Sequence, residues 1–196
     1  MLINQEIVTL LNQHGGKAVG LTGKDGRLIL SKPFSSKKWM QGLGPDHQDA
    51  AEEDYGLVGE IDAICPQILF KLQQDNFIPV IAPIGVDRKG VANNINADLV
   101  AGAVAGALKA EKLLVLTDVK GIRDADNRHL STLSRKDMER LVKKGTIGEG
   151  MLPKVRACLT GIEAGVHKAH IIDGRIEHSV LLEIFTDKGI GTEIVA

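Results

Sequence analysis

The chain is poor in aromatic residues and in cysteine. Its 196 residues include one Trp, one Tyr and four Phe, so few rings are available for stacking on nucleic acid bases. The two cysteines, Cys65 and Cys158, are far apart in the sequence and form neither a CxxC motif nor a metal-ligand cluster. We expect both to be small buried thiols in a reducing compartment, rather than partners in a structural disulfide.

The chain also lacks an excess of charge of one sign and a long hydrophobic run. Its formal net charge is −1 and no long basic run occurs, which argues against nucleic acid as a partner. No apolar run is long enough to span a membrane, and the polar residues Asn4, Gln5 and Glu6 are not typical of a signal peptide. We therefore expect a cytoplasmic protein, or a plastid protein if the source is a plant or alga.

What the chain does contain is an alternation of helical and strand patterns. Helices are expected over about 2–13, 66–76 and 97–109, and strands over about 17–22, 27–31, 58–64, 77–84 and 113–116. The polar stretch 32–54 is expected to be a surface loop or a variable insertion. Alternation of this kind predicts an α/β fold with a largely parallel sheet.

The segment 90–98 combines three Asn residues with a carboxylate just before the third expected helix. Asn96 is a candidate N-cap, and Asp98 falls in the first helical turn. Because the amino end of a helix carries a partial positive charge, the polar turn formed by this segment is suited to holding an anion. The alternative is a well-capped helix without a ligand.

Two further segments carry features of a nucleotide site. The apolar run 113–116 ends at a polar turn with Asp118 and Gly121, and ligands of open α/β sheets bind beyond the carboxyl ends of strands. The loop 145–151 contains three glycines and leads into Pro153, which marks the start of another helix. Lys154 would lie in the first turn of that helix, where a bound polyphosphate would offset its unfavourable interaction with the helix dipole. A lysine that extends into solvent is the other reading.

These segments, taken in order, resemble the motifs of acetylglutamate kinases, which belong to the amino acid kinase superfamily. The matching motifs are Asn-Ile-Asn-Ala-Asp at 94–98, Leu-Thr-Asp-Val-Lys-Gly-Ile at 116–122 and Gly-Met-Leu-Pro-Lys-Val at 150–155. The segments 15–26, 56–61 and 78–85 fit the same family. The resemblance therefore runs along the whole chain.

The resemblance implies a three-layer αβα sandwich with a mainly parallel central sheet. Residues 1–108 would be the remainder of a substrate-binding lobe, and residues 109–196 a nucleotide-binding lobe. The family's first strand with a lysine and glycine turn, its His-Gly-Gly-Gly-Pro loop and a later arginine have no counterpart here. We therefore expect the amino-terminal part of the family fold to be missing, which would leave this chain incomplete for catalysis.

The implied activity is ATP-dependent, Mg²⁺-assisted phosphorylation of the side-chain carboxylate of N-acetyl-L-glutamate to an acyl phosphate, in arginine biosynthesis. Lys154 and Asp98 would be catalytic, whereas Asn94 and Asn96 would bind the substrate. The implied nucleotide contacts are Asp118, Val119, Lys120, Gly121, Ile122, Arg123, Thr146, Ile147 and Gly148. No resident metal site is expected.

In the arginine-sensitive branch of the family, a carboxyl-terminal His, Glu and glycine turn hold the inhibitor arginine. By resemblance, His178, Glu183 and Gly189 are the candidate arginine contacts, because a buried carboxylate suits a guanidinium group. Family members form dimers or hexamers, and some bind a PII signalling protein. Two other interpretations stay open: a related kinase with another substrate, and a non-catalytic arginine-sensing or partner-binding module.

Overall fold

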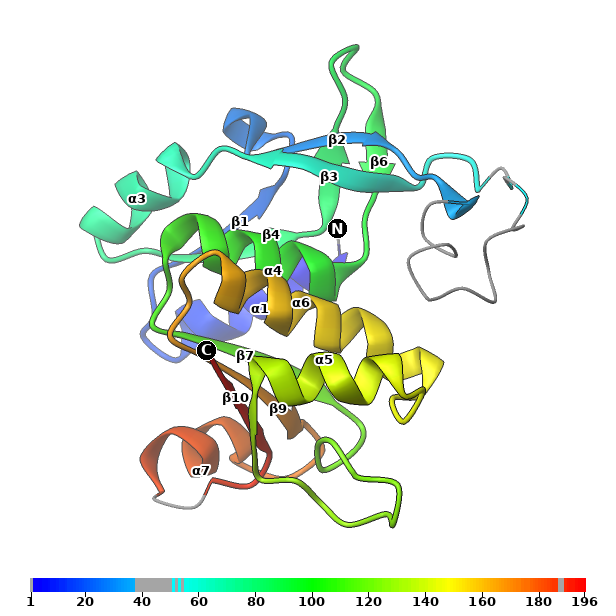
Figure 1. The fold of residues 1–196 in the computed structure, drawn as a ribbon. Helices are drawn as coiled ribbons and strands as arrows, with labels where there is room; N and C mark the ends of the chain where they lie inside the picture. The colour runs from blue at the N-terminus through cyan, green and yellow to red at the C-terminus, as the bar shows by residue number, and fades with distance from the viewer. Residues whose placement is uncertain (1, 38–50, 52, 54, 187–188) are drawn as a thin grey trace. The chain divides into compact units, whose positions relative to one another are not determined.

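The computed structural model describes residues 2–37, 51, 53, 55–186 and 189–196 (Figure 1). Most of the polar stretch 32–54 lies outside these residues. The chain forms two compact units, 1–100 and 101–196, whose boundary falls inside helix α4 (Ala97–Leu108). The boundary between the two units therefore falls before residue 108, where the boundary between the two lobes is expected. The roles of the two units as substrate-binding and nucleotide-binding lobes remain predictions.

The first unit begins with helix α1 (Leu2–Gln13), which packs on the parallel pair of strands β1 (Ala18–Thr22) and β4 (Ile78–Ala82). Two side chains fasten the helix to these strands. The Asn4 amide donates to the Val80 carbonyl at 2.8 Å, and Asn12 accepts a hydrogen bond from the Ala18 amide at 2.7 Å. Helix α1 ends at Gln13 and is followed by a turn at Gly15, whose φ of 85° is readily adopted only by glycine.

The remaining strands of the first unit form a second sheet, ordered β3-β2-β5-β6. Its strands are β2 (Ile29–Pro33), β3 (Gly59–Ile64), β5 (Ile84–Val86) and β6 (Ala92–Asn94). The short helix η1 (Asp25–Arg27) precedes β2, and helix α3 (Gln67–Gln74) follows β3. The single strand expected over 77–84 is wrong, because the chain passes from β4 in one sheet to β5 in the other at Pro83. Proline has no amide hydrogen to continue a strand ladder.

The second unit contains one sheet, ordered β7-β9-β10-β8. Its elements after α4 are β7 (Lys112–Thr117), β8 (Thr132–Ser134), α5 (Arg135–Lys143), η3 (Glu149–Met151), α6 (Leu152–Glu163), β9 (Lys168–Asp173), α7 (Ser179–Phe185) and β10 (Thr192–Val195). Helices α5 and α6 cover one face of this sheet and α7 covers the other (Figure 1). The predicted αβα layering is thereby confirmed.

The strand pairs are partly parallel and partly antiparallel. Strands β1 and β4, β2 and β5, β7 and β9, and β8 and β10 pair in parallel, as expected. The pairs β2 with β3, β5 with β6, and β9 with β10 are antiparallel, which the sequence did not predict. The hairpin between β5 and β6 explains one of them, since Gly90 with a φ of 86° closes a turn too short for a parallel crossover.

The core of the second unit lies between the sheet and helices α5 and α6. Val155 and Cys158 of α6, Met138 of α5, Ile171 of β9 and Ile194 of β10 are fully buried in it. Burying an aliphatic side chain of this size stabilises a fold by about 1.5–3 kcal/mol. Neither cysteine forms a disulfide, and only Cys158 is buried, whereas Cys65 is half-buried.

Helix α5 and strands β8 and β9 were not assigned from the sequence. A signal for α5 exists: the Ser134 hydroxyl caps the helix by accepting a hydrogen bond from the Asp137 amide at 3.1 Å. Strand β8 is only three residues long, too short for a periodic pattern to identify it. In β9, the polar His170 interrupts an apolar run and obscures the strand.

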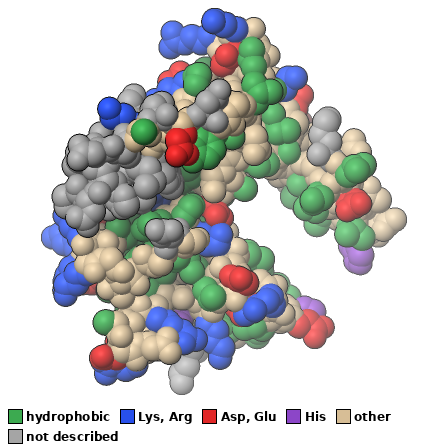
Figure 2. All heavy atoms as spheres, turned by 90° about the vertical axis from the view of Figure 1, so that its right-hand side faces the viewer, with side chains coloured by type: hydrophobic (Ala, Val, Ile, Leu, Met, Phe, Trp, Pro, Cys, Tyr) green, Lys and Arg blue, Asp and Glu red, His purple; other side chains and the backbone are tan. Residues whose placement is uncertain are grey.

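The surface carries charges of both signs. On the face drawn in Figure 2, acidic and basic side chains are intermixed with apolar and neutral ones, in keeping with the formal net charge of −1. Among the described residues, no helix is both long enough and apolar enough to cross a membrane.

Helices α4 and α6 approach closely at Gly102, which allows a test of the packing. A Cβ atom on Gly102 would lie 2.4 Å from the Ala157 carbonyl oxygen, so Gly102→Ala is expected to lower the free energy of unfolding by about 1–3 kcal/mol. The matched control is Gly161→Ala, whose Cβ would come no nearer than 3.4 Å to a flexible Leu113 methyl group. Urea denaturation of both variants measures the difference, and equal stabilities would contradict the close approach.

Candidate active site and effector pocket

The amino end of α4 is capped as expected. The Asn96 side-chain oxygen accepts hydrogen bonds from the amides of Asp98 at 3.0 Å and Leu99 at 3.2 Å. Caps of this kind stabilise a helix by about 1 kcal/mol. Asn96 is exposed and Asp98 is half-buried. Both residues lie at the amino end of α4, where the helix dipole is positive.

The polar turn expected before this helix is partly wrong, because residues 92–94 form strand β6. Asn93 is buried and donates to the Ser31 hydroxyl at 3.0 Å, which ties β6 to β2. Asn94 is exposed at the end of the strand, and its amide donates to the Leu57 carbonyl at 2.8 Å. Asn94, Asn96 and Asp98 therefore remain grouped at the helix end, whereas Asn93 has a structural role.

A small pocket of about 230 Å³ borders the same helix end. Its lining residues are Phe34, Val58, Gly59, Glu60, Asn96 and Leu99. Asn96 contributes an amide to an otherwise largely apolar wall. The pocket is thus suited to an apolar group attached to a polar one.

In the second unit, a pocket of about 290 Å³ brings most of the predicted nucleotide contacts together. Its lining residues are Val119, Gly121, Ile122, Arg123, Asp124, Asn127, Thr146, Ile147, Gly148 and Met151. Every predicted nucleotide residue except Asp118 and Lys120 is among them. Asp124, Asn127 and Met151 were missed, because no motif distinguishes them in the sequence.

One wall of this pocket is a loop between Ile122 and Leu130, whose backbones are joined by a 2.9 Å hydrogen bond. Inside the loop, the Asp124 carboxylate accepts hydrogen bonds from the amides of Asp126 and Arg128, both at 2.9 Å. The bond from the Arg128 amide is the main reason that the pKa of Asp124 lies below its usual value. We call residues 122–130 the nucleotide loop.

The opposite wall leads from the glycine-rich segment into α6. A Cβ atom on Gly148 or Gly150 would meet no atom within 4 Å, so the backbone there is open to a close-approaching ligand. Helix α6 begins at Leu152 with proline in its first turn, as predicted. Lys154 lies in that turn and is half-buried.

Asp118 and Lys120 follow the carboxyl end of β7 and are exposed. The neighbouring strand β9 ends at Asp173, which is buried and pairs with Arg175 through bonds of 2.8 and 3.0 Å. Hydrogen bonds from Arg175 hold the pKa of Asp173 at about 2, and the charge of Lys120 contributes to this shift. Asp173 and Arg175 were not identified from the sequence as residues near the candidate site.

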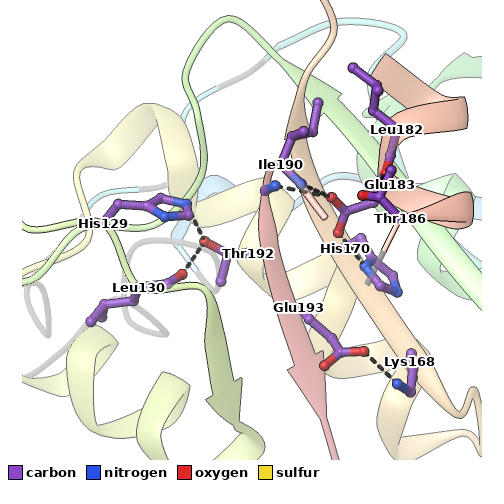
Figure 3. A network of polar contacts seen from close by, with 11 residues as sticks. His129, Leu130, Lys168, His170, Leu182, Glu183, Thr186, Ile190, Thr192 and Glu193 are labelled. Carbon is purple, nitrogen blue, oxygen red and sulfur yellow. Dashed lines mark hydrogen bonds and ion pairs between the residues drawn. The ribbon is translucent and has the colours of Figure 1, made fainter. Parts of the chain in front are cut away.

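Glu183 lies at the centre of a second, polar site (Figure 3). One carboxylate oxygen accepts from His170 Nδ1 at 2.7 Å, and the other accepts from the amides of Ile190 at 2.6 Å and Gly191 at 3.0 Å. Burial by itself would raise the pKa of Glu183, but these donors outweigh it, so the pKa lies below its usual value. Glu183 is therefore a buried, ionised carboxylate.

The predicted partners of Glu183 differ in position. Gly189 lies beside it, with a φ of 59°, and a Cβ atom there would be 2.7 Å from the carboxylate. His178 does not line the pocket: it is exposed at the start of α7, with a left-handed φ of 56°. His170, which sequence reasoning missed, contacts Glu183 because it projects from β9 toward α7.

The pocket next to Glu183 has a volume of about 200 Å³ and carries charges of both signs. Its lining residues are Lys112, Ser131, Thr132, Lys168, His170, Glu183, Ile184, Thr186, Gly189, Gly191 and Glu193. Lys168 and Glu193 form an ion pair at 2.6 Å (Figure 3). His170 Nε2 is buried and has no hydrogen-bond partner among the described residues, so a polar ligand group has an atom to meet.

Comparison with known proteins identifies the family. Residues 1–173 match the model of the amino acid kinase family. The chain belongs to this family. It is 50% identical over 196 residues to an acetylglutamate kinase of Sulfurihydrogenibium, and 51% identical over 198 residues to one of Persephonella marina. These matches cover 98% and 100% of the chain but 65% and 66% of the relatives, so the chain spans about two thirds of their length.

Solved structures support the same fold. The crystal structure of N-acetylglutamate synthase from Neisseria gonorrhoeae, in complex with coenzyme A and L-arginine, has a TM-score of 0.71 and 25% identity. It matches 92% of this chain and 38% of the synthase. Carbamate kinase from Giardia lamblia, bound to AMP-PNP, has a TM-score of 0.64 and 18% identity. The match covers 98% of this chain and 70% of the carbamate kinase, and at this identity it shows a shared fold alone.

The Asp173–Arg175 pair predicts a pH dependence. Asp173 has a pKa of about 2, below its ordinary value of 3.8, so ionisation of its carboxylate stabilises the fold above pH 3.8 and this contribution is lost as pH falls toward 2. Asp173→Asn should therefore destabilise the chain at pH 7, and the gap to the unmodified chain should narrow progressively below pH 4. Denaturant titrations at a series of pH values measure the gap. Asp126→Asn, at an exposed position, is the control, and a pH-independent gap for Asp173→Asn would contradict the assignment.

Proposed function

We propose that this chain is the part of an acetylglutamate kinase that binds ATP and helps to hold N-acetyl-L-glutamate. The reaction would transfer the terminal phosphoryl group of ATP to the side-chain carboxylate, giving an acyl phosphate on the route to arginine. The observation that carries the proposal is the single pocket lined by Gly121, Ile122, Arg123, Thr146 and Gly148, which the motifs associate with the nucleotide. The identity of about 50% to acetylglutamate kinases supports it.

The attacking carboxylate is already an anion, so the reaction needs no general base. Catalysis then depends on alignment and on neutralising the charge that spreads over the transferring phosphoryl group. Lys154, in the first turn of α6, would supply positive charge together with the amides at that helix end. Asp98, in the first turn of α4, would orient lysine side chains by ion pairing.

The substrate and the metal would be held by few groups of this chain. Asn94 would bind the α-substituents of acetylglutamate, with Asn96 supporting the helix end beside it. Mg²⁺ would enter with ATP, coordinated by phosphate oxygens, since this ion retains waters and favours oxygen ligands. The sugar and base of the nucleotide would lie between the nucleotide loop and Thr146–Gly148, with Asp118 and Lys120 at the rim.

We infer a cytoplasmic protein that functions as a homo-oligomer, and the bacterial origin of the reported relatives supports the location. The plastid alternative has no support among them. Binding of a PII protein stays a prediction from the resemblance. The non-catalytic arginine-sensing or partner-binding module remains the second candidate function, because the pocket beside Glu183 carries charges of both signs and suits a small charged ligand.

The kinase proposal is tested by ADP release with ATP, Mg²⁺ and N-acetyl-L-glutamate. In a preparation that releases ADP, Lys154→Ala is expected to lower kcat by about 10²- to 10³-fold, the usual effect of removing one group that stabilises transition-state charge. Lys136→Ala, an exposed position on α5, is the control and should leave kcat unchanged. An unmodified chain that binds ADP in calorimetry but releases none from ATP would have a nucleotide site without the rest of the catalytic groups, and a chain that does not bind ADP would contradict both nucleotide assignments.

We further propose that the Glu183 pocket binds free arginine as an effector. The buried carboxylate of Glu183 would meet the guanidinium group, since a carboxylate can accept about four hydrogen bonds and Glu183 has three donors. Lys112 and Lys168 would face the carboxylate of the ligand, and His170 Nε2 would gain a partner. The arginine bound to the structurally similar synthase from Neisseria gonorrhoeae supports this choice of ligand.

The positions of the two histidines make the arginine proposal specific. Glu183→Ala and His170→Asn are each expected to weaken arginine binding at least about tenfold, because each removes a polar group that lines the pocket. His178→Asn should bind arginine as the unmodified chain does, since His178 is exposed outside the lining. Calorimetric titration with L-arginine measures all three. Loss of binding in His178→Asn alone would restore the arrangement expected from the sequence.

A further inference from the structure

The hydroxyl group of Thr192 joins the two ends of the nucleotide loop. Its oxygen accepts a hydrogen bond from the Ile122 amide at 2.8 Å and donates one to the Leu130 carbonyl at 2.6 Å (Figure 3 shows the latter). Ile122 and Leu130 are the first and last residues of the loop, and they also bond to each other. One hydroxyl group from β10 therefore closes the base of the loop that lines the proposed nucleotide pocket.

The fit around Thr192 is tight. Its side chain is fully buried, and His129 Nε2 lies 3.4 Å from its hydroxyl oxygen. Gly121 has a φ of 133°, and a Cβ atom there would come within 2.5 Å of the Thr192 oxygen. The start of the loop can take its observed path only because residue 121 has no side chain, so the position of the loop depends directly on that of Thr192.

The same short segment also reaches the Glu183 pocket. The amides of Ile190 and Gly191 donate to Glu183, and the next residue is Thr192. Gly191 packs closely against β9, because a Cβ atom added there would lie 2.3 Å from the Ile171 carbonyl oxygen. Residues 190–192 thus make polar contacts with Glu183 at one end and with the nucleotide loop at the other.

We propose that Thr192 is a positioning residue of the nucleotide pocket and that segment 190–192 couples this pocket to the Glu183 pocket. The inference rests on the proposed nucleotide site. A change in the hydrogen bonds of Glu183 would shift the amides of residues 190 and 191, and with them the hydroxyl group that anchors the loop. Because coupling between two sites is reciprocal, nucleotide binding would in turn change the Glu183 pocket.

Thr192→Val tests the positioning role. Valine has nearly the shape of threonine but leaves the Ile122 amide and the Leu130 carbonyl without the hydroxyl that both contact, and unsatisfied buried groups are costly. We expect Thr192→Val to bind ADP about tenfold more weakly than the unmodified chain. Calorimetry measures the affinity, under conditions in which circular dichroism shows that each variant is folded. Thr192→Ser restores the hydroxyl group and should recover most of the affinity. Thr160→Val makes the same change at an exposed site on α6 and should bind ADP normally.

Thr192→Val with unchanged ADP affinity would overturn the positioning role, as would Thr192→Ser that binds no better than Thr192→Val. Failure of the unmodified chain to bind ADP would instead refute the proposed nucleotide site, so the two failures are distinguishable. A purely structural role for Thr192 would lower the melting temperature without affecting the ADP affinity of the folded variant.

A double-mutant cycle tests the coupling. Glu183→Gln is expected to change ADP affinity several-fold in the chain with Thr192, and to have little further effect in the chain with Thr192→Val. Non-additive effects of this kind would support transmission through residues 190–192. Additive effects would overturn the coupling, because Glu183 and Thr192 would then act on the nucleotide independently.

Discussion

The arrangement of the second unit depends on β9, the strand that pairs with β7 on one edge and β10 on the other. Successive side chains of a strand point to opposite faces. Ala169 and Ile171 therefore enter the core beneath α5 and α6, whereas His170 faces α7 and holds Glu183. The strand ends at Asp173, directly opposite Thr117 of β7. One strand thus supports the core, the Glu183 pocket and the edge of the candidate nucleotide site.

The two candidate sites of this unit use different physical devices. The candidate nucleotide pocket has glycines at 121 and 148 in its lining and a loop organised by the Asp124 carboxylate. Such a site suits phosphate groups, which bind backbone amides and helix ends. The Glu183 pocket is instead lined by charged side chains and a buried carboxylate that accepts three hydrogen bonds. It suits a small ligand that carries charges of both signs.

Membership of the amino acid kinase family accounts for the layered fold, and the pockets indicate how this chain uses it. The described residues that line the two pockets of the second unit all belong to that unit, so ligand binding at these candidate sites can be examined separately from phosphoryl transfer. The first unit contributes the capped amino end of α4 and the small apolar pocket beside Asn96.

The sequence by itself determined the helices α1 and α4, because apolar periodicity and the residues around a helix start are local properties of the chain. It also determined the cap at Asn96 and the proline start of α6, since each depends on residues within one helical turn. Only the tertiary structure decided that β4 and β5 belong to different sheets, and that His170 rather than His178 contacts Glu183. It alone revealed Thr192 at the base of the nucleotide loop, because the Ile122–Thr192 bond joins residues that are distant in the sequence and leaves no periodic or local signal.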